Sequence, residues 1–371
     1  MLKLVISAIF ALSTAHAADL PKKDSNGAYI SREAKFKFEI LVQQQDVVWG
    51  FDFLNDKQII FTERGGALRI LDLESKKVTD VAGAPKVWVK GQGGLLDVRV
   101  HPKKRNIIFL TYSEPIGEKA TTAFATATLE KNKLINFKKI ISAHEPSDED
   151  IHFGSRIEFD GKGHIFVTMG ERNARDHVQN MSYHTGKLLR FNEDLTVPKD
   201  NPLVGKKDAK PEIWSWGHRS NQGLTRHPET GEIYLVEMGP RGGDEVNLIK
   251  KGANYGWPDV TYGREYYGPR IGVTAKEGTE QPVVYWVPSI SPSGANFYSG
   301  TKFVNWKNNL FIGTLSGQHL HRVVFDKGKV VAQEELLTDL SLRIRNVRTG
   351  PDGALYISTD DGKIARLVAA Y

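Results

Sequence analysis

Residues 95–114, LLDVRVHPKKRNIIFLTYSE, decide the fold of this chain. Apolar and polar residues alternate through LLDVRV, a polar turn follows at HPKKRN, and a second apolar run rich in β-branched and aromatic residues completes the segment. Alternation with a period of two on both sides of a turn is typical of a β-hairpin with one buried face. The segment is therefore predicted to form two antiparallel strands.

The same hairpin pattern recurs along the whole chain. Copies begin at Val48, Leu95, Ser155, Gln222, Gly294 and Arg345. Their second strands share an aromatic residue, spaced 45 to 77 residues apart: Phe61, Phe109, Phe166, Tyr234, Phe311 and Tyr356. Repeats of this length are typical of four-stranded propeller blades with insertions between strands. We predict an all-β chain, a six-bladed β-propeller of four-stranded antiparallel blades. A strand over residues 36–42 is expected to pair with the C-terminal hairpin and close the ring.

The composition excludes several other classes of protein. The 371 residues include no cysteine, which excludes thiolate metal sites and cysteine nucleophiles. The 50 basic and 44 acidic residues give a net charge of +6, but they are interspersed, so we interpret them as a solvated surface and expect no nucleic-acid partner. No GxGxxG turn joins a strand to a helix, and a Rossmann-type cofactor site is therefore not expected.

The N-terminus has the pattern of an export signal. Lys3 precedes the apolar residues 4–12, and Ala15-His16-Ala17 is a small-x-small cleavage site. The apolar stretch is too short to cross a bilayer, and no later segment is long and apolar enough to do so. We expect residues 1–17 to be a signal peptide and residues 18–371 to be a single propeller domain. The protein is expected to be periplasmic or secreted, with no membrane span.

Four stretches break the repeat and are the candidates for chemistry. They are residues 91–96, 152–154, 214–223 and 237–245. Because the loops of all blades converge at the central channel of a propeller, stretches this far apart in the sequence can form one site. A further segment over residues 257–281, rich in Tyr, Gly and Pro, is expected to be a long loop over one face.

The residue types in these stretches suggest specific roles, each with a simpler alternative. An imidazole such as His152 suits a general base, or it is a loop histidine bonded to backbone. The guanidinium groups of Arg219, Arg343 and Arg345 suit an anionic ligand, or they form surface ion pairs. The irregular segment 239–245, with its carbonyls and carboxylates, suits calcium, or it is an ordinary turn.

Together these stretches carry a family resemblance. The motifs GQGGLLD, HFGxR, GHRxxQG and GPRGGDE, followed by NYGWP at residues 254–258, occur in this order within residues 38–367. In this combination the chain resembles the soluble aldose sugar dehydrogenases that use pyrroloquinoline quinone (PQQ) and calcium. That group is related to soluble quinoprotein glucose dehydrogenase.

The resemblance implies roles for individual residues. His152 matches the base that takes the proton of the sugar C1 hydroxyl, Glu171 the acid that orients this histidine, and Arg219 the arginine that stabilises charge on the reduced quinone. The residues that match the cofactor-binding set are Gln92, Arg219, Ser220, Met238, Ser289, Arg343 and Arg345. The residues that match calcium ligands are Gly239 and Pro240 at the cofactor, and Glu245 and Tyr255 at a second, structural ion.

Four positions depart from the family pattern near the cofactor. Ser220 stands in place of an asparagine, Met238 of a Gln or His, Ser316 of a lysine, and Ile151 of a polar residue. Each change removes a hydrogen bond or a charged contact, which is worth about 1–3 kcal/mol where the group is well paired. Together they are expected to weaken cofactor binding.

The resulting hypothesis is an enzyme that uses PQQ and calcium to oxidise aldose sugars at C1 to the lactone. An external acceptor must take the electrons, because the chain has no CxxCH haem-attachment motif. One alternative is a propeller without the cofactor that acts as a carbohydrate-binding or scaffold protein. Another is a lactonase or other hydrolase, for which the expected cluster of carboxylates and Asn is missing. The chain is expected to be a monomer or a homodimer.

Overall fold

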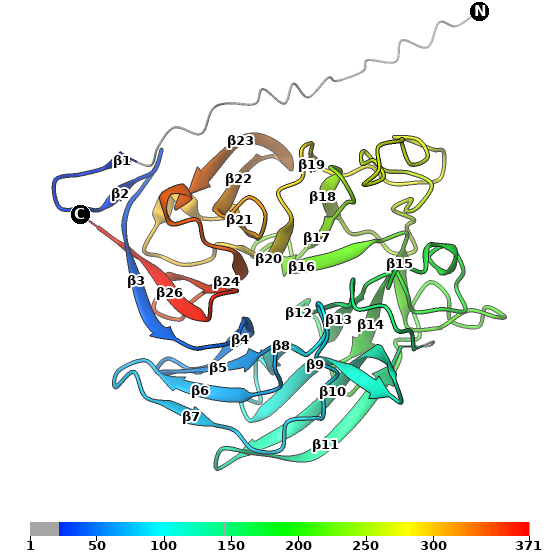
Figure 1. The fold of residues 1–371 in the computed structure, drawn as a ribbon, viewed down its shortest axis with the longest axis horizontal. Helices are drawn as coiled ribbons and strands as arrows, with labels where there is room; N and C mark the ends of the chain where they lie inside the picture. Colours follow the sequence, from blue (N-terminus) through cyan, green and yellow to red (C-terminus); the bar gives the residue numbers. More distant parts are fainter. Residues whose placement is uncertain (1–21, 144–145, 371) are drawn as a thin grey trace, which may run out of the picture.

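The computed structural model describes residues 22–143 and 146–370, so the expected signal peptide at residues 1–17 lies outside the described residues. The described residues are mainly β-strand and form six sheets arranged around a central axis (Figure 1). Every sheet contains four antiparallel strands, and one sheet also carries a two-strand extension. The predicted all-β, six-bladed propeller is confirmed.

The first five blades each use four consecutive strands. Blade 1 comprises β4 (Val48–Asn55), β5 (Gln58–Glu63), β6 (Leu68–Asp72) and β7 (Val78–Asp80). Blade 2 comprises β8 (Leu95–Val100), β9 (Ile107–Ile116), β10 (Lys119–Glu130) and β11 (Lys133–Ser142). Blade 3 comprises β12 (Gly154–Phe159), β13 (His164–Met169), β14 (Lys187–Asn192) and β15 (Ile213–Trp216). Blade 4 comprises β16 (Ser220–Arg226), β17 (Ile233–Met238), β18 (Asp244–Leu248) and β19 (Val284–Trp286). Blade 5 comprises β20 (Pro292–Phe297), β21 (Leu310–Thr314), β22 (Leu320–Asp326) and β23 (Lys329–Leu336).

Blade 6 joins the two ends of the described chain. It comprises β24 (Ile344–Thr349), β25 (Leu355–Thr359), β26 (Lys363–Ala369) and, as its outer strand, β3 (Lys35–Gln43), with β1 (Lys22–Lys23) and β2 (Tyr29–Ile30) beyond it. Phe38 of β3 lies opposite Leu367 of β26 in the antiparallel ladder. The prediction that residues 36–42 close the ring is confirmed, and the ring cannot open without breaking this ladder. The described chain also contains three short 3₁₀ segments: η1 (Arg175–His177), η2 (Val304–Trp306) and η3 (Thr338–Leu340).

The repeated aromatic residues are buried on the second strand of each blade. Each of the six positions has 3 % or less of its surface exposed. They pack in clusters that join neighbouring blades, as where Phe53 and Phe61 of blade 1 meet Tyr356 of blade 6. Full burial of such a side chain contributes about 1.5–3 kcal/mol. The repeat therefore marks the contacts that hold adjacent blades together.

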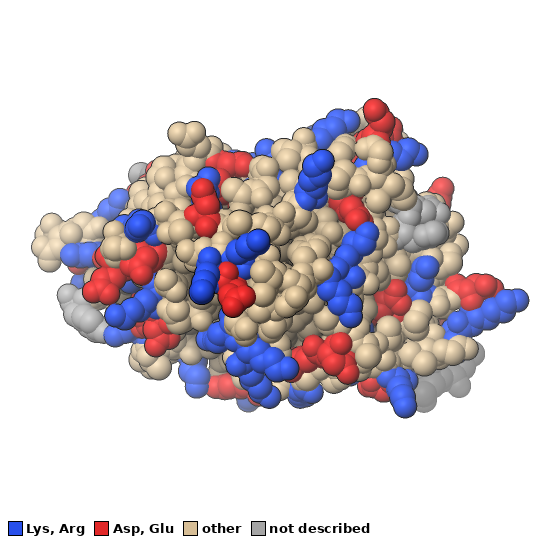
Figure 2. Space-filling view, turned by 90° about the horizontal axis from the view of Figure 1, so that it is seen from below, with Lys and Arg blue, Asp and Glu red and all other residues tan. Residues whose placement is uncertain are grey.

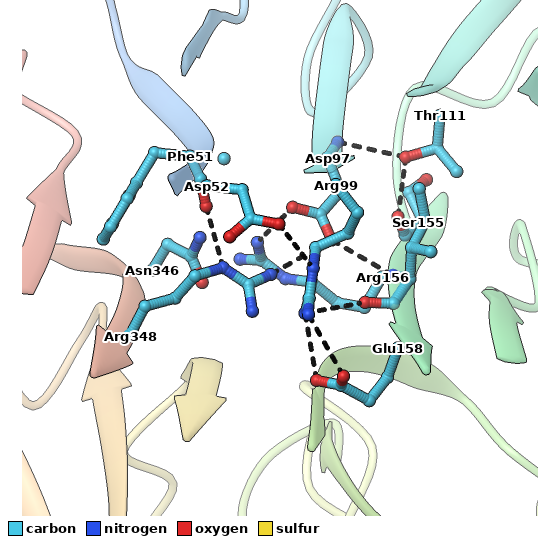
Figure 3. A network of polar contacts seen from close by, with 12 residues as sticks. Phe51, Asp52, Asp97, Arg99, Thr111, Ser155, Arg156, Glu158, Asn346 and Arg348 are labelled. Atoms are coloured by element: carbon cyan, nitrogen blue, oxygen red, sulfur yellow. Dashed lines mark hydrogen bonds and ion pairs between the residues drawn. The ribbon is translucent and has the colours of Figure 1, made fainter. Parts of the chain in front are cut away.

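Charged side chains fill the central channel between the innermost strands (Figure 3). Arg99 of β8 lies 3.1 Å from the Asp52 carboxylate of β4 and 3.0 Å from that of Glu158 on β12. Asp97, which has no exposed surface, lies 3.4 Å from Arg156. Buried charges are tolerated when they are paired and hydrogen-bonded in this way. The channel is thus closed by paired side chains at this depth, and a ligand site must lie nearer one end.

The outer surface carries both signs of charge. On the face shown in Figure 2, Lys and Arg side chains alternate with Asp and Glu side chains rather than forming one field. This agrees with the interpretation of the basic residues as a solvated surface. Within residues 22–143 and 146–370, no helix is long and apolar enough to cross a membrane.

Candidate active site

One end of the central channel opens into a cavity of about 430 Å³. The register of the blades explains why distant residues meet there. The start of each innermost strand pairs with the end of the second strand, as in Gly154 with Met169 and Ser220 with Met238. Residues that precede an innermost strand or follow a second strand therefore converge on this end. The predicted residues that line the cavity are Gln92, His152, Arg219, Met238, Gly239, Pro240, Ser289, Arg343 and Arg345.

His152 and Glu171 form a buried pair at the cavity wall. Nδ1 of His152 lies 2.6 Å from Oε1 of Glu171, whose side chain is 1 % exposed. A carboxylate only accepts hydrogen bonds, so Nδ1 carries the hydrogen and Nε2 keeps a lone pair. Burial, together with the positive charges of Arg219 and Arg172, lowers the pKa of His152, although Glu171 acts against the shift. The imidazole is therefore neutral at neutral pH and able to accept a proton at Nε2.

The backbone at His152 is held in an unusual conformation. Its φ of 53° lies in the left-handed region, which is uncommon for residues other than glycine. The His152 N–H donates to Oε1 of Gln92 at 2.8 Å, and the Gln92 N–H donates to the Asp150 carbonyl at 2.7 Å. Gln92 thus fixes the loop that presents the histidine in addition to lining the cavity. The ring itself bonds a carboxylate, so the alternative of a histidine that bonds only backbone is not what the structure shows.

Arg219 spans the gap between the histidine and the turn that follows β17. Its Nη1 donates to the carbonyls of Met238 at 3.1 Å and Gly239 at 2.8 Å. Its Nε is buried with no hydrogen-bond partner in the described structure. The Gly239 carbonyl, expected to bind calcium, is therefore already engaged by a guanidinium. A cation at this carbonyl would have to share it with Arg219 or displace the arginine.

Arg343 and Arg345 share one carboxylate at the opposite wall. Asp360 lies 2.9 Å from Nε of Arg343 and 2.7 Å from Nε of Arg345. Arg343 also donates to the Leu315 carbonyl at 3.2 Å. Two guanidinium groups and one carboxylate leave one net positive charge at this wall. Both arginines remain oriented toward the cavity, since both line it.

A buried aspartate organises the serine-rich part of the wall. Asp244 accepts hydrogen bonds from the Ser289 hydroxyl and from the backbone N–H groups of Gly239, Ile290 and Ser291. It thereby ties the turn after β17 to the segment before β20. The predicted cofactor residue Ser289 is thus bonded to Asp244.

Of the positions that depart from the family pattern, Met238 lines the cavity, whereas Ser220 and Ser316 only adjoin residues that do. The hydroxyl of Ser316 lies 2.7 Å from that of Ser291. Ser220 lies directly after Arg219 and is 1 % exposed, and its hydroxyl is buried without a partner in the described structure. Neither hydroxyl brings a charge to the cavity.

A second, much smaller cavity lies behind Arg219. Its volume of about 10 Å³ is bounded by Glu237, Glu245 and Tyr255 among others. Burial and the neighbouring carboxylates of Glu237 and Asp244 raise the pKa of Glu245 well above its ordinary value. A hard cation bound in so small a cavity would stabilise the ionised form of the carboxylates that crowd around it. Glu245 and Tyr255, the two residues expected at the second calcium site, both line this small cavity.

Some residues of the cavity were not singled out by the sequence. Trp49, Tyr266 and Asp360 line it but belong to ordinary-looking strand ends or to the long loop. The loop expected over residues 257–281 is present between β18 and β19, and it brings Tyr266 to the site. Trp49 lies on the innermost strand β4 and Asp360 directly follows the second strand β25, so only the periodicity of the blades pointed to these two positions.

Comparison with known proteins agrees with this geometry. The sequence profile of the family described as Glucose / Sorbosone dehydrogenase matches residues 45–366. The chain belongs to this family. It is 40 % identical over 338 residues to the aldose sugar dehydrogenase YliI of Escherichia coli, covering 88 % of this chain and 91 % of the relative. It is 26 % identical over 453 residues to quinoprotein glucose dehydrogenase B of Acinetobacter calcoaceticus, covering 96 % and 92 %.

Structural comparison gives the same result. The apo-form crystal structure of the soluble aldose sugar dehydrogenase of Escherichia coli superposes with a TM-score of 0.87 at 38 % identity, covering 90 % of this chain and all of the other. As a member of the glucose/sorbosone dehydrogenase family, the chain is an oxidoreductase of the sugar dehydrogenase class. The predicted family resemblance and the prediction of an enzyme are confirmed.

Proposed function

We propose that this protein oxidises aldose sugars at C1 to the lactone, with PQQ and calcium as cofactors and an external acceptor for the electrons. The observation that carries the proposal is the His152–Glu171 pair at the wall of a cavity that four arginines also line, Arg64, Arg219, Arg343 and Arg345. A neutral buried imidazole with its free nitrogen toward the cavity is suited to remove a proton from a sugar hydroxyl. The proposal includes export to the periplasm or the exterior.

The cavity fits a flat, polyanionic cofactor. Its volume of about 430 Å³ lies within the range of sites for small organic ligands, about 300–1,000 Å³. Arg343 and Arg345 would bind carboxylates of PQQ, and Gln92 and Ser289 would offer it polar contacts at the rim. Arg219 also lines the cavity and brings a further positive charge to it. When bound, PQQ would supply the two-electron acceptor that the side chains of this protein do not provide.

The proton chemistry belongs to the protein itself. In this proposal Nε2 of His152 accepts the proton of the C1 hydroxyl, while the C1 hydrogen leaves with its two bonding electrons as hydride to the acceptor that PQQ would supply. Glu171 keeps the hydrogen on Nδ1 and stabilises the imidazolium that results. Arg219 lies close enough to His152 to lower its pKa, and its positive charge would stabilise negative charge that develops on an oxygen in the cavity.

Calcium fits one of its two expected positions better than the other. The small cavity beside Glu237 and Glu245 offers two carboxylates and nearby carbonyls, as calcium requires. At the cofactor the Gly239 carbonyl already accepts a hydrogen bond from Arg219, so a cation there would share this carbonyl with the guanidinium or displace it. The proposal assigns the Glu245 site a structural role.

A titration of the chelator-treated, full-length mature protein with PQQ tests the proposal, with and without calcium. Cofactor absorbance reports binding, and reduction of an artificial dye on addition of glucose and other aldoses reports turnover. We expect calcium-dependent binding followed by sugar-dependent dye reduction. Absence of binding at high PQQ and calcium would overturn the proposal and leave a propeller that binds carbohydrate or serves as a scaffold. In that case the changes at Ser220, Met238 and Ser316 would be the first positions to restore.

A further inference from the structure

Two buried histidines meet in blade 5, outside the cavity described above. His319 and His321 flank Leu320 at the start of β22, so the period of two places both on one face of the strand. They are 3 % and 4 % exposed. On the neighbouring strand β23 the same period places Gln333 and Glu335 on one face, and Glu335 lies opposite His321 in the ladder.

The four ring nitrogens lie in one continuous chain of contacts. Nδ1 of His319 lies 2.9 Å from the Gly317 carbonyl, and its Nε2 lies 3.0 Å from Nδ1 of His321. Nε2 of His321 lies 2.8 Å from Oε1 of Gln333. That oxygen is identified by a second contact, because the indole N–H of Trp286, which can only donate, points at it from 2.9 Å. Both ends of the chain are therefore hydrogen-bond acceptors.

The three contacts of this chain require more hydrogens than two neutral imidazole rings carry. Three contacts must be filled, one at each oxygen and one between the rings. Two neutral imidazoles carry only two N–H groups. If both outer nitrogens donate to their oxygens, the inner nitrogens of His319 and His321 face each other at 3.0 Å with two lone pairs and no hydrogen between them. A positive charge between them, either a proton or a metal ion, would remove this repulsion.

We propose that His319, His321 and Glu335 bind a divalent transition-metal ion of the zinc type. The ligand atoms of these three residues lie within 4.8 Å of one another, and an oxygen of Glu335 is 4.0 Å from Nε2 of His319. Two nitrogens bound to one tetrahedral zinc at about 2.0–2.1 Å are separated by about 3.3 Å, so the rings need to part by only a few tenths of an ångström. The side chain of Glu335 is 42 % exposed, which leaves it free to turn toward the ion.

The surroundings have the features of a metal centre. Each histidine donates its outer N–H to an oxygen, which fixes the ring and makes the inner nitrogen a better ligand. Burial lowers the pKa values of both His319 and His321, so both inner nitrogens are available without competition from protons near neutral pH. A carboxylate at the exposed side balances part of the charge of the ion. Water from the same side would complete the coordination.

The site also bears on the sugar dehydrogenase cavity. Gly317, whose carbonyl accepts from His319, belongs to the turn between β21 and β22 and donates from its N–H to the Ile290 carbonyl. The same turn carries Leu315, which lines the cavity and accepts a hydrogen bond from Arg343. An ion bound by the histidines would therefore restrict the movement of this turn, which carries Leu315.

Equilibrium dialysis against zinc tests the proposal. The chelator-treated, full-length mature protein is dialysed against zinc chloride with calcium in large excess, so that sites built from oxygen ligands are filled with calcium. We expect one zinc ion per chain and, with cobalt(II) in place of zinc, the intense visible bands of a four-coordinate site. His321→Gln should lose that ion, whereas His227→Gln, which alters a histidine whose ring accepts from turn N–H groups, should keep it.

Glu335→Gln is a second variant that tests the site even if His321→Gln does not fold, because the Glu335 side chain lies at the surface. It should weaken zinc binding by about tenfold or more, the loss typical of a charged contact. If the unaltered protein takes up no zinc, or if His321→Gln and Glu335→Gln both bind it as tightly as the unaltered protein, the proposal is wrong. A shared proton then fills the space between the rings.

Discussion

At the scale of single residues, the proposed reaction depends on one nitrogen atom, Nε2 of His152. The ring is oriented by Glu171 and its backbone is held by Gln92, so replacement of the ring by an amide should leave the surrounding loop intact. We predict that His152→Gln lowers kcat by about 10²–10⁴-fold, the usual contribution of a general base, and leaves the Kd for PQQ within about threefold. Dye-reduction kinetics and cofactor titration measure the two quantities separately. An unchanged kcat would exclude His152 as the base.

The pH dependence of the reaction should report the same pair. Because the base must be neutral, kcat falls as the pH drops through the pKa of His152, which burial places below its ordinary value of 6.5. The Glu171 carboxylate raises this pKa. In Glu171→Gln the pKa should fall further, so the acid side of the kcat profile moves to lower pH while the maximum rate drops. A profile that moves to higher pH would contradict the assigned role of Glu171.

Ser316 tests whether the missing charge matters. Its hydroxyl contacts only Ser291 among the described residues, and the serine is exposed at the cavity rim. Ser316→Lys should add a cation beside Leu315 and lower the Kd for the anionic cofactor by about tenfold, which corresponds to one charged hydrogen bond. Ser316→Gln controls for size without charge and should change the Kd by less than about threefold. Equal effects of both variants would show that charge is not what the cavity lacks.

At the scale of elements, Asp244 connects blades 4 and 5 through hydrogen bonds. It accepts four hydrogen bonds, one from the turn after β17 and three from the segment before β20. Asp244→Ala leaves these donors without an acceptor, and we predict a loss of about 2–5 kcal/mol in the free energy of unfolding together with weaker PQQ binding. Urea denaturation and cofactor titration measure the two effects.

Ser289→Ala is the matched control for this connection, since it removes one of the four bonds and leaves the Asp244 carboxylate in place. It should cost about 1 kcal/mol. If Asp244→Ala costs no more than Ser289→Ala, the aspartate does not organise the wall.

At the scale of the whole molecule, the parts of the fold that repeat were predictable and the contacts that occur once were not. Each hairpin shows its buried face locally, so the six blades and the closing strand around Phe36 followed from alternation alone. The cavity residues His152, Arg219 and Gln92 followed from motifs. The sharing of Asp360 by Arg343 and Arg345, and the engagement of the Gly239 carbonyl by Arg219, have no local pattern in the sequence.

Arg156 shows why such contacts need the assembled ring. It lies on β12 of blade 3, and its guanidinium donates to one group on the innermost strand of every other blade. The five acceptors are the Trp49 carbonyl, the Asp97 carboxylate, the Gln222 carbonyl, the Ser293 hydroxyl and the Arg345 carbonyl, at 2.6–3.5 Å. It also stacks at 4.0 Å on the ring of Trp49, which lines the cavity. One side chain thus connects all six blades directly beneath the site.

Substitution of Arg156 therefore tests how much these contacts between blades contribute to the stability of the ring. Arg156→Met would leave the buried Asp97 without this partner and several acceptors without a donor, so we predict a loss of about 3–5 kcal/mol in the free energy of unfolding. Arg156→Lys retains the charge but cannot reach six strands, and it should fall between Met and the unaltered protein. Lys57→Met is the control, because Lys57 pairs with Glu74 in blade 1 with 74 % of its side chain exposed, and it should cost about 1 kcal/mol or less. Urea denaturation of the three variants shows whether Arg156 stabilises the contacts among all six blades or only forms an ordinary buried ion pair. If Arg156→Met costs no more than Lys57→Met, the blades are held by their apolar contacts alone and the guanidinium only fills the channel.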